Sequence, residues 1–329
     1  MRSPRGGGAH IRVMKAIVVS QHGGPEVLQL CDVPDPRAKA GEVLVRVEAA
    51  GVNFADVMMA RGSHPFGPRP PYLAGLEFAG TGVDTGERVM GICEGGAFAE
   101  RIAVRRDRLF AVPENLSTPE AAAFPGNYFT AYFIYYLAHV KPRERVLIHA
   151  AAGGVGTAAI ELGNIFGVET FGTSSADEKL VRLKELGLDH GINYSTGDYE
   201  EAVRNLTNGE GVDVVFDALG GDDTVKGIRC LRHLGRVVVY GLFSGRLPEF
   251  DFFALLRNNI SVLAFSLVPM SQHPELMDQA WQQMSEWLRL GKLRPIVGHQ
   301  LPLAHAADGL RLLVERRNYG KVVLKPHEA

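Results

Sequence analysis

The segment Ala151-Ala152-Gly153-Gly154-Val155-Gly156 has the residue types and the spacing of a pyrophosphate-binding turn. It follows the apolar run Arg145–Ala150 and precedes the helical spacing of Val155–Phe166, so it would join a buried strand to a helix. A glycine turn there lets the backbone approach a pyrophosphate, which then lies on the unpaired amides of the helix. The alternative is a tight turn that only packs helix on strand. The position favours a dinucleotide site at Ala152, Gly153, Gly154, Val155 and Gly156.

The end of the following strand indicates which dinucleotide is bound. NAD-binding folds place Asp or Glu there, about twenty residues after the glycine turn, whereas this chain has Gly172-Thr173-Ser174-Ser175. Without a carboxylate to repel a 2′-phosphate, NADPH is favoured over NADH. Asp177-Glu178 count against this, although at the start of a helix they can serve its dipole. Tyr194 could reach the phosphate or merely pack. The residues that we expect around the phosphate are Ser174, Ser175, Lys179, Tyr194 and Arg317.

Composition limits the class of protein. The chain has 329 residues, of which 46% are hydrophobic and 22% charged, which is typical of an ordinary globular protein, and the length favours two domains. Its net charge of −2 provides no positive field for nucleic acid or for an anionic membrane. The apolar run Tyr128–Ala138 is too short to span a bilayer, which needs about 20 residues. Cys31, Cys93 and Cys230 lie far apart without a CxxC pair, so a reducing cytoplasm fits best.

The type of secondary structure that the sequence predicts around the glycine turn changes along the chain. From Lys15 to about Val112, short strand-like runs punctuated by Gly and Pro predict a compact, mostly antiparallel β domain. A capping box at Ser117-Thr118-Pro119-Glu120 starts a helix, which Pro125-Gly126 should break before a second, aromatic-rich helix over Asn127–Ala138.

After Pro142 strands and helices alternate, which predicts a doubly wound parallel sheet. The expected strands are 145–150, 168–172, 212–218 and 236–242, with helices over 155–166, 177–186 and 222–233. A helix over 275–290, a strand over 296–300, a helix over 304–316 and a strand over 321–324 should return to the first domain. The predicted domains are therefore 14–126 with 268–329, and 127–267, after a disordered extension over 1–13.

Five motifs stand out along the chain: Gly51–Asp56, Tyr128–Tyr132, Ala150–Gly156, Asp217–Gly221 and Gly235–Gly241. In combination they resemble the zinc-independent quinone oxidoreductase branch of the medium-chain dehydrogenase/reductase superfamily, near its crystallin-like and vesicle amine transport-like members. The resemblance runs from about Met14 to Pro326. It implies a GroES-like catalytic domain, a Rossmann domain, NADPH, and hydride transfer to a quinone or an activated enone.

The resemblance also implies site residues. The Thr130 hydroxyl would face the nicotinamide, or else be satisfied by the preceding helical turn. The amide of Asn53, at the end of a strand, would hydrogen-bond the acceptor or the nicotinamide ribose, or else hold a turn. The further cofactor contacts implied by the resemblance are Leu219, Gly220, Tyr240, Gly241 and Phe243.

No metal site is expected. Zinc-dependent relatives carry Cys after the first-loop glycine and a His-Glu pair after a later one, where this chain has Val52-Asn53 and Leu76-Glu77. His64 and Cys93 remain as isolated soft ligands, which are far more often ordinary residues.

The sequence does not identify the residue that donates the proton. Many quinone oxidoreductases carry a tyrosine a few residues after the Asn-Phe motif, where this chain has Met58-Met59. The sequence does not rank the candidates, which are Asp56, His64, Tyr72 and Tyr128; together with Asn53 and Thr130, Asp56 and Tyr72 make up the predicted catalytic set.

Three functions compete. The first is NADPH-dependent reduction of a small quinone or enone. The second is reduction of an enoyl thioester, in which the basic cluster Arg101, Arg105, Arg106 and Arg108 would face an acyl-carrier partner. The third is a crystallin-like or vesicle-associated role with bound NADPH but no catalysis. In each case the apolar strip Phe252–Leu256 and Ile260–Val268 at the last strand of the parallel sheet favours a homodimer.

Overall fold

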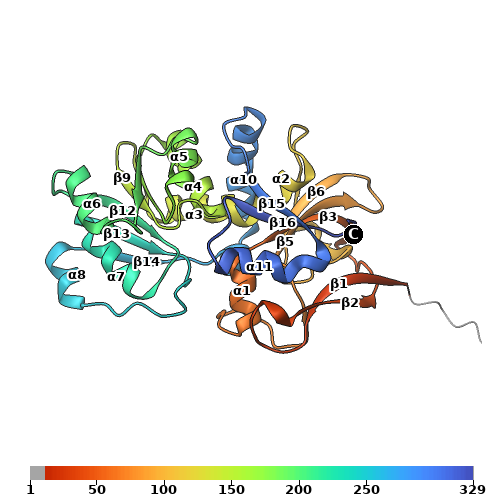
Figure 1. Cartoon of the computed structure of the whole chain (residues 1–329). Coiled ribbons are helices and arrows are strands. Elements are labelled where there is room, and N and C mark those ends of the chain that lie inside the picture. The colour runs from red at the N-terminus through yellow and green to blue at the C-terminus, as the bar shows by residue number, and fades with distance from the viewer. Residues whose placement is uncertain (1–11, 329) are drawn as a thin grey trace, which may run out of the picture.

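The computed structural model describes residues 12–328, which form a β-rich domain beside a domain with a parallel sheet (Figure 1). Eleven residues of the predicted extension, 1–11, lie outside the described part of the chain. The last residue of the predicted extension, Val13, already pairs with Pro34, so the first strand begins earlier than expected.

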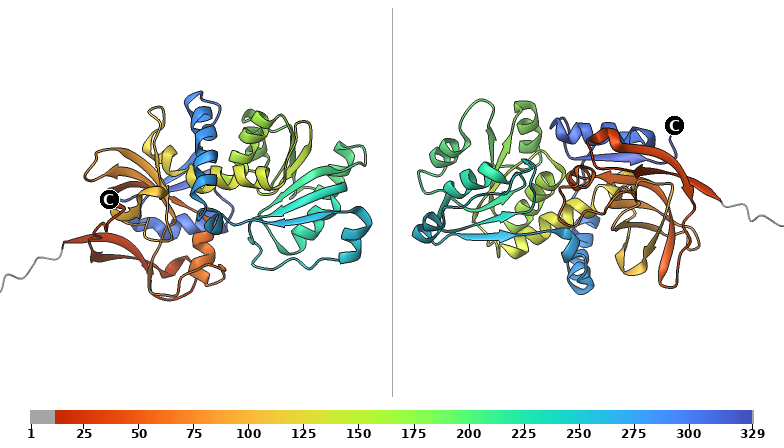
Figure 2. Two further views of the ribbon diagram at one scale, coloured as in Figure 1. Left: turned by 180° about the vertical axis from the view of Figure 1, so that it is seen from behind. Right: turned by 90° about the horizontal axis from the view of Figure 1, so that it is seen from below.

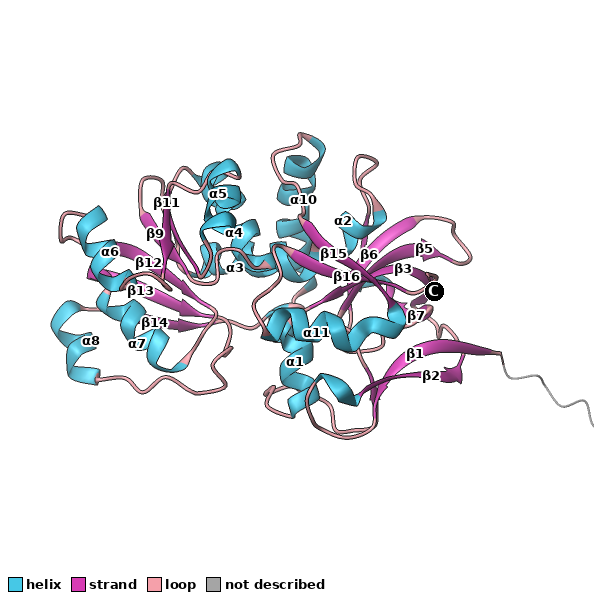
Figure 3. Ribbon diagram, in the orientation of Figure 1, coloured by secondary structure: helices cyan, strands magenta, loops and turns pink. Residues whose placement is uncertain are grey.

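The parallel sheet has six strands in the order β11-β10-β9-β12-β13-β14, and every neighbouring pair is parallel. This is the doubly wound Rossmann arrangement expected from the alternating pattern, and Figure 3 shows its helices around the sheet. The strands are β9 (Arg145–Ile148), β10 (Glu169–Ser174), β11 (His190–Asn193), β12 (Val212–Asp217), β13 (Leu231–Val239) and β14 (Ser261–Ala264). The helices are α4 (Gly154–Phe166), α5 (Asp177–Glu185), α6 (Tyr199–Leu206), α7 (Gly221–Arg229) and α8 (Phe252–Asn258).

The β-rich, GroES-like domain uses both ends of the described chain. A seven-stranded sheet has the order β15-β16-β3-β5-β6-β8, with β7 also on β3, and a three-stranded sheet has the order β2-β1-β4. Val322 pairs with Val52, so the last strand lies antiparallel to β3. The residue limits of the two domains stay a prediction. The strands are β1 (Val13–Val19), β2 (Leu28–Pro34), β3 (Glu42–Val52), β4 (Tyr72–Leu73), β5 (Glu77–Gly82), β6 (Arg88–Ile92), β7 (Arg101–Arg105), β8 (Leu109–Ala111), β15 (Val297–Pro302) and β16 (Lys321–Lys325).

The remaining helices lie in this domain or at the junction. They are α1 (Phe54–Arg61), α2 (Thr118–Ala122), α3 (Thr130–Leu137), α9 (Leu267–Met270), α10 (Pro274–Arg289) and α11 (Ala306–Val314). Figures 1 and 2 both show α10 between the two domains. The ring centroid of Trp281 on this helix lies 5.4 Å from that of Phe110 and 5.7 Å from that of Phe124. Between residues 12 and 328, every helix is too short or too polar to cross a bilayer.

Two local expectations need correction. The first helix ends as expected before Pro125, but the break lies at 123–124, and Pro125–Phe129 already forms a π-helical turn that runs directly into α3. The helix expected over 222–233 ends at Arg229, and residues 231–233 belong to β13. The Val212 N–H donates to the Cys230 carbonyl at 2.9 Å, so the chain enters the sheet as soon as the helix ends.

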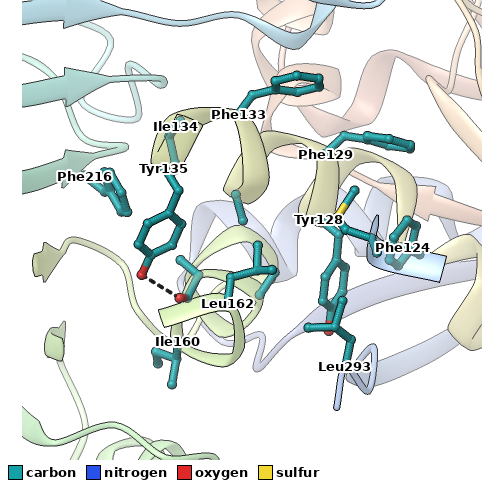
Figure 4. Close-up of a cluster of buried hydrophobic side chains, with 14 of the residues drawn as sticks. Phe124, Tyr128, Phe129, Phe133, Ile134, Tyr135, Ile160, Leu162, Phe216 and Leu293 are labelled. Atoms are coloured by element: carbon teal, nitrogen blue, oxygen red, sulfur yellow. Dashed lines mark hydrogen bonds between the residues drawn. The ribbon is translucent and has the colours of Figure 1, made fainter. Parts of the chain in front are cut away.

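Aromatic side chains fill the interface between α3 and α4 (Figure 4). Tyr135 donates its hydroxyl to the Ala159 carbonyl at 2.9 Å, and Phe129 and Phe133 are fully or almost fully buried. Tyr128 donates to Glu161 at 2.5 Å within the same core. These contacts fix the π-helical turn against the helix that begins at the glycine motif.

Candidate functional site

A cleft of about 970 Å³, part of it open to solvent, lies between the two domains. Residues from the carboxyl ends of β9, β10, β12 and β13 line it on one side. The segment between α11 and β16, together with the end of β3 and the start of α1, lines the other side. A crevice at the carboxyl ends of parallel strands is where this type of sheet binds ligands.

The glycine turn opens into this cleft at four of its five predicted positions: Ala152, Gly153, Gly154 and Val155. Gly153 is the N-cap of α4, so the first amides of that helix point toward the cleft. A Cβ at Gly154 would lie 2.4 Å from the Asn127 amide oxygen, so this glycine allows Asn127 to approach the turn. Gly156 does not line the cleft. A Cβ there would lie 2.5 Å from the Ala151 carbonyl, so it packs the helix on the strand.

Ser174, Ser175, Lys179 and Tyr194 line one end of the cleft, as expected for a phosphate site. Lys179 donates from Nζ to the carbonyls of Arg316 at 2.6 Å and Asn318 at 2.8 Å, and burial lowers the pKa of this ammonium group. Asp177, the first carboxylate on α5, accepts a hydrogen bond from the Asn193 amide at 2.8 Å.

The arginine at this end is Arg316 and not Arg317. Arg316 lines the cleft and donates to the Tyr194 hydroxyl at 3.0 Å. Arg317 instead pairs with Glu315 at 3.1 Å, outside the cleft, which corrects the sequence-based expectation. The difference arises because α11 ends at Val314, two residues earlier than predicted, and Arg316 takes a left-handed backbone with φ of 56°.

Leu219, Tyr240 and Phe243 line the opposite end, whereas Gly220 and Gly241 do not. Gly220, with φ of 74°, caps α7, and a Cβ on Gly241 would lie 2.6 Å from the Ala218 carbonyl. Both glycines therefore shape the loops behind the lining side chains. The Phe243 ring lies 3.9 Å from that of Phe54 on α1, between centroids, so the two domains touch at this end.

Asp217 holds the loop that carries Leu219. Its carboxylate accepts from the backbone N–H of Leu219 at 2.9 Å and of Gly220 at 3.2 Å, and it contacts His149 Nδ1 at 2.9 Å. Burial opposes ionisation of Asp217, but its contacts with His149, Thr224 and the Leu219 N–H keep the pKa of this carboxyl below its usual value. Both side chains are fully buried, so the pair fixes this loop against the end of β9.

A buried polar cluster, consisting of Lys321, Glu77, Asn53 and Asn127, borders the cleft. Lys321 forms an ion pair with Glu77 and donates to the amide oxygens of Asn53 at 2.7 Å and Asn127 at 3.3 Å. Asn53 Nδ2 donates to Glu77 Oε1 at 2.7 Å. Lys321 is 2% exposed and Glu77 1% exposed. Of these four residues, only Asn53 is predicted as a site residue from the sequence. The available signal for the others is a lysine at the start of the apolar run Val322–Leu324.

Three residues of the predicted catalytic set do not line the cleft: Thr130, Asp56 and Tyr72. Thr130 is 8% exposed at the start of α3. Asp56 accepts a hydrogen bond from the Asn53 N–H at 2.8 Å, and burial raises the pKa of its carboxyl to about 7. Tyr72 pairs with Val19 in the sheet. Burial, together with the smaller effect of the nearby Asp56 charge, raises the pKa of the Tyr72 hydroxyl to about 12.

The other two candidate proton donors are also engaged elsewhere. Tyr128 donates to Glu161, and His64 Nδ1 accepts from the Phe66 N–H at 3.2 Å. In the described part of the chain, His, Cys, Asp and Glu side chains do not gather in any group of three or more suited to a metal ion. The cleft lining therefore provides binding and positioning groups, while the proton donor stays unassigned.

A β-rich domain, a doubly wound parallel sheet and a glycine turn at the cleft between them define a medium-chain dehydrogenase/reductase architecture. Residues 39–114 match the alcohol dehydrogenase GroES-like domain, and residues 154–288 match the zinc-binding dehydrogenase domain. The chain is 35% identical to the synaptic vesicle membrane protein VAT-1 homolog of Danio rerio, over 94% of this chain and 69% of the relative.

Two solved structures extend the comparison. The quinone oxidoreductase of Thermus thermophilus, also solved in complex with NADPH, has a TM-score of 0.84 and 36% identity, covering 95% of this chain and all of the other. The Escherichia coli quinone oxidoreductase complexed with NADPH has a TM-score of 0.90 and 28% identity, over 95% of this chain and all of the other. The chain belongs to the quinone oxidoreductase branch of the medium-chain dehydrogenase/reductase superfamily, a family of oxidoreductases.

Proposed function

We propose that this protein is an NADPH-dependent reductase that transfers hydride to a quinone or an α,β-unsaturated carbonyl compound without zinc. The observation that carries the cofactor choice is the phosphate end of the cleft, where two serines, Lys179 and Arg316 gather at the end of β10 without a lining carboxylate. Charge-assisted hydrogen bonds from such groups favour a 2′-phosphate. Relatives solved with NADPH support the same choice.

The residues fit the cofactor along the length of the cleft. The amides at Gly153–Val155 would bind the pyrophosphate, because Gly153 leaves the backbone open to it. Leu219, Tyr240 and Phe243 would surround the nicotinamide end. When bound, NADPH supplies the hydride. The protein supplies orientation and excludes water with apolar and aromatic side chains.

The buried polar cluster serves to position these groups. Lys321 uses its three donors on Glu77, Asn53 and Asn127, so its ammonium group is held in place. Asn53 is committed to Lys321 and Glu77, which favours a positioning role over direct binding of the acceptor. Zinc independence rests on Val52 and Leu76, which stand where zinc-dependent relatives carry ligands.

The enoyl-thioester alternative finds less support. Its acyl-carrier partner would dock on the basic cluster, but Arg101 bonds Asp35 at 2.8 Å, Arg105 pairs with Asp107, and Arg108 bonds the Ser271 carbonyl and Gln272. These contacts engage three of the four guanidinium groups within the chain. These contacts favour a small-molecule acceptor over an acyl-carrier partner.

The proposed partners are a small acceptor and a second copy of the chain. Strand β14 is the last strand of its sheet, and beside it Phe252 is 66% exposed and Phe253 73% exposed. A second copy could cover this apolar edge symmetrically. Sedimentation velocity at micromolar concentration should show a dimer; a species of only the 35.8 kDa chain mass would contradict this proposal. The three free cysteines favour the cytoplasm as the proposed location.

A substrate panel tests the proposed function. NADPH oxidation is followed by absorbance with simple quinones, α,β-unsaturated ketones and a crotonyl thioester, with and without added zinc or chelator. We expect turnover of quinones or enones that is insensitive to chelation. Turnover of the thioester alone would favour the enoyl-thioester alternative. Tight NADPH binding without turnover of any acceptor would favour the non-enzymatic role.

A further inference from the structure

The segment Glu315–Gly320, here called the strap, connects α11 to β16 and forms one wall of the cleft. It belongs in sequence to the end of the chain but touches the Rossmann domain through Arg316 and residues 318–320. The Gly320 N–H donates to the Ala152 carbonyl at 2.9 Å, and Gly153 and Gly320 form an isolated parallel bridge. The strap thus reaches the glycine turn at one end and the phosphate end of the cleft at the other.

The phosphate end is assembled jointly by the strap and α5. Lys179 donates to two strap carbonyls, those of Arg316 and Asn318, at 2.6 and 2.8 Å. Arg316 reaches back to the Tyr194 hydroxyl at 3.0 Å. The positions of both cations therefore depend on the strap conformation. The left-handed backbone of Arg316, with φ of 56°, closes the end of α11, where the Arg317 N–H donates to the Leu312 carbonyl at 2.9 Å. Beyond this turn, the course of the strap depends on its contacts with the Rossmann domain.

One such contact involves Tyr319, near the far end of the strap. The guanidinium carbon of Arg182 lies 3.5 Å from the centroid of the Tyr319 ring, well within cation–π range. Arg182 follows Lys179 by three residues on α5, so both cations project from one face of that helix onto the strap. Tyr319 is only 6% exposed and, unlike its neighbours Asn318 and Gly320, does not line the cleft. It therefore acts behind the site and not within it.

We propose that Arg182 and Tyr319 are positioning residues for cofactor discrimination: their contact fixes the strap, and the strap places Lys179 and Arg316 for the 2′-phosphate. This inference rests on the proposed NADPH dependence. Loss of the contact should release the strap and weaken only the interactions that depend on it. NADH carries no 2′-phosphate, so its binding should change little.

Fluorescence titration of NADPH and NADH provides the test. Arg182→Gln removes the cation from an exposed position, and Tyr319→Phe keeps the aromatic face while Tyr319→Leu removes it. Lys184→Gln is the matched control, because it removes an equal charge from the same helix at an exposed site. We expect Arg182→Gln and Tyr319→Leu to raise the Kd for NADPH about fivefold, with that for NADH unchanged. Tyr319→Phe and Lys184→Gln should resemble the wild type.

Hydrogen exchange of the cofactor-free protein supplies a second readout. The amides of residues 316–320 should exchange faster in Arg182→Gln than in the wild type or in Lys184→Gln. Unchanged exchange, or equal weakening of both cofactors in Arg182→Gln, would overturn the positioning role while the wild type still prefers NADPH. A wild type that binds NADH as tightly as NADPH would instead overturn the cofactor assignment itself.

Discussion

At the phosphate end of the cleft, Lys179 and Arg316 are held by backbone carbonyls and a tyrosine hydroxyl, which leave their positive charges uncancelled. In the buried polar cluster that borders the cleft, here called the positioning end, Lys321 lies against Glu77, and the pair is neutral in sum. An uncancelled cation attracts an anionic ligand, whereas a buried, paired cation fixes the side chains around it. The first end is built for recognition and the second for positioning, and each can be disturbed separately.

The largest effect is expected from Lys321→Met. It leaves the Glu77 carboxylate buried without its partner, which should lower the free energy of unfolding by about 3 to 5 kcal/mol. Urea unfolding measures the loss. The double variant Lys321→Met with Glu77→Gln removes both charges and should recover much of the stability. If the single variant were as stable as the wild type, the buried pair would not organise this end.

Gly153→Val should abolish cofactor binding and leave the fold intact. Gly153 has an extended backbone, with φ of −79°, that valine can adopt, but the branched side chain would occupy the space of the pyrophosphate. Losing two amide–phosphate hydrogen bonds should weaken NADPH at least about a hundredfold. Circular dichroism serves as the control for folding. Near-normal NADPH titration would show that the turn is only structural.

Asp56→Asn should change the pH dependence of stability at the positioning end. Burial raises the pKa of the Asp56 carboxyl to about 7 in the folded protein, against an ordinary value of 3.8. The unfolded chain therefore loses its proton first, and stability falls as pH rises from about 4 to about 7, by at most about 1.4 kcal/mol per pH unit. Asn cannot titrate, so the variant should lose this slope. Urea midpoints at several pH values measure it; an unchanged slope would assign it to other groups.

The smallest effect separates two neighbouring arginines at the recognition end. Arg316→Ala should raise the Kd for NADPH about fivefold to tenfold and leave that for NADH unchanged, because it removes a charged donor from the phosphate site. Arg317→Ala is the matched control and should resemble the wild type, since that side chain pairs with Glu315. Fluorescence titration of both cofactors measures the difference. If Arg317→Ala weakened NADPH binding and Arg316→Ala did not, Arg317 would be the arginine of the phosphate site.

The recognition end could largely be predicted because its parts follow strand ends that the sequence marks. Apolar runs locate β9 and β10, and the glycine turn and the serines come directly after them. Arg316 was missed by one position because the helix pattern does not show where α11 ends. The strap register depends on a left-handed residue that nothing in the local sequence requires.

The positioning end could not be predicted in the same way. Asn53 and Lys321 are 268 positions apart, and Asn127 and Lys321 are 194 positions apart. Their contacts depend on how two domains and the end of the chain come together, which no local pattern determines. The predicted proton donors do not line the cleft, because their side chains are engaged elsewhere: Asp56 accepts from the Asn53 N–H, and Tyr128 donates to Glu161 in the core beside α4.

The pairing of β16 with β3 has a consequence for synthesis. A ribosome releases residues in order, so strands β1 to β8 and the complete Rossmann domain emerge before Lys321 does. Until then the end of β3 has an open edge, and Glu77 has no ammonium partner. The Rossmann domain can therefore fold during translation, whereas the first domain to be made is the last to be completed. Chains that stop before residue 321 should lack the last strand of one domain and one wall of the cleft.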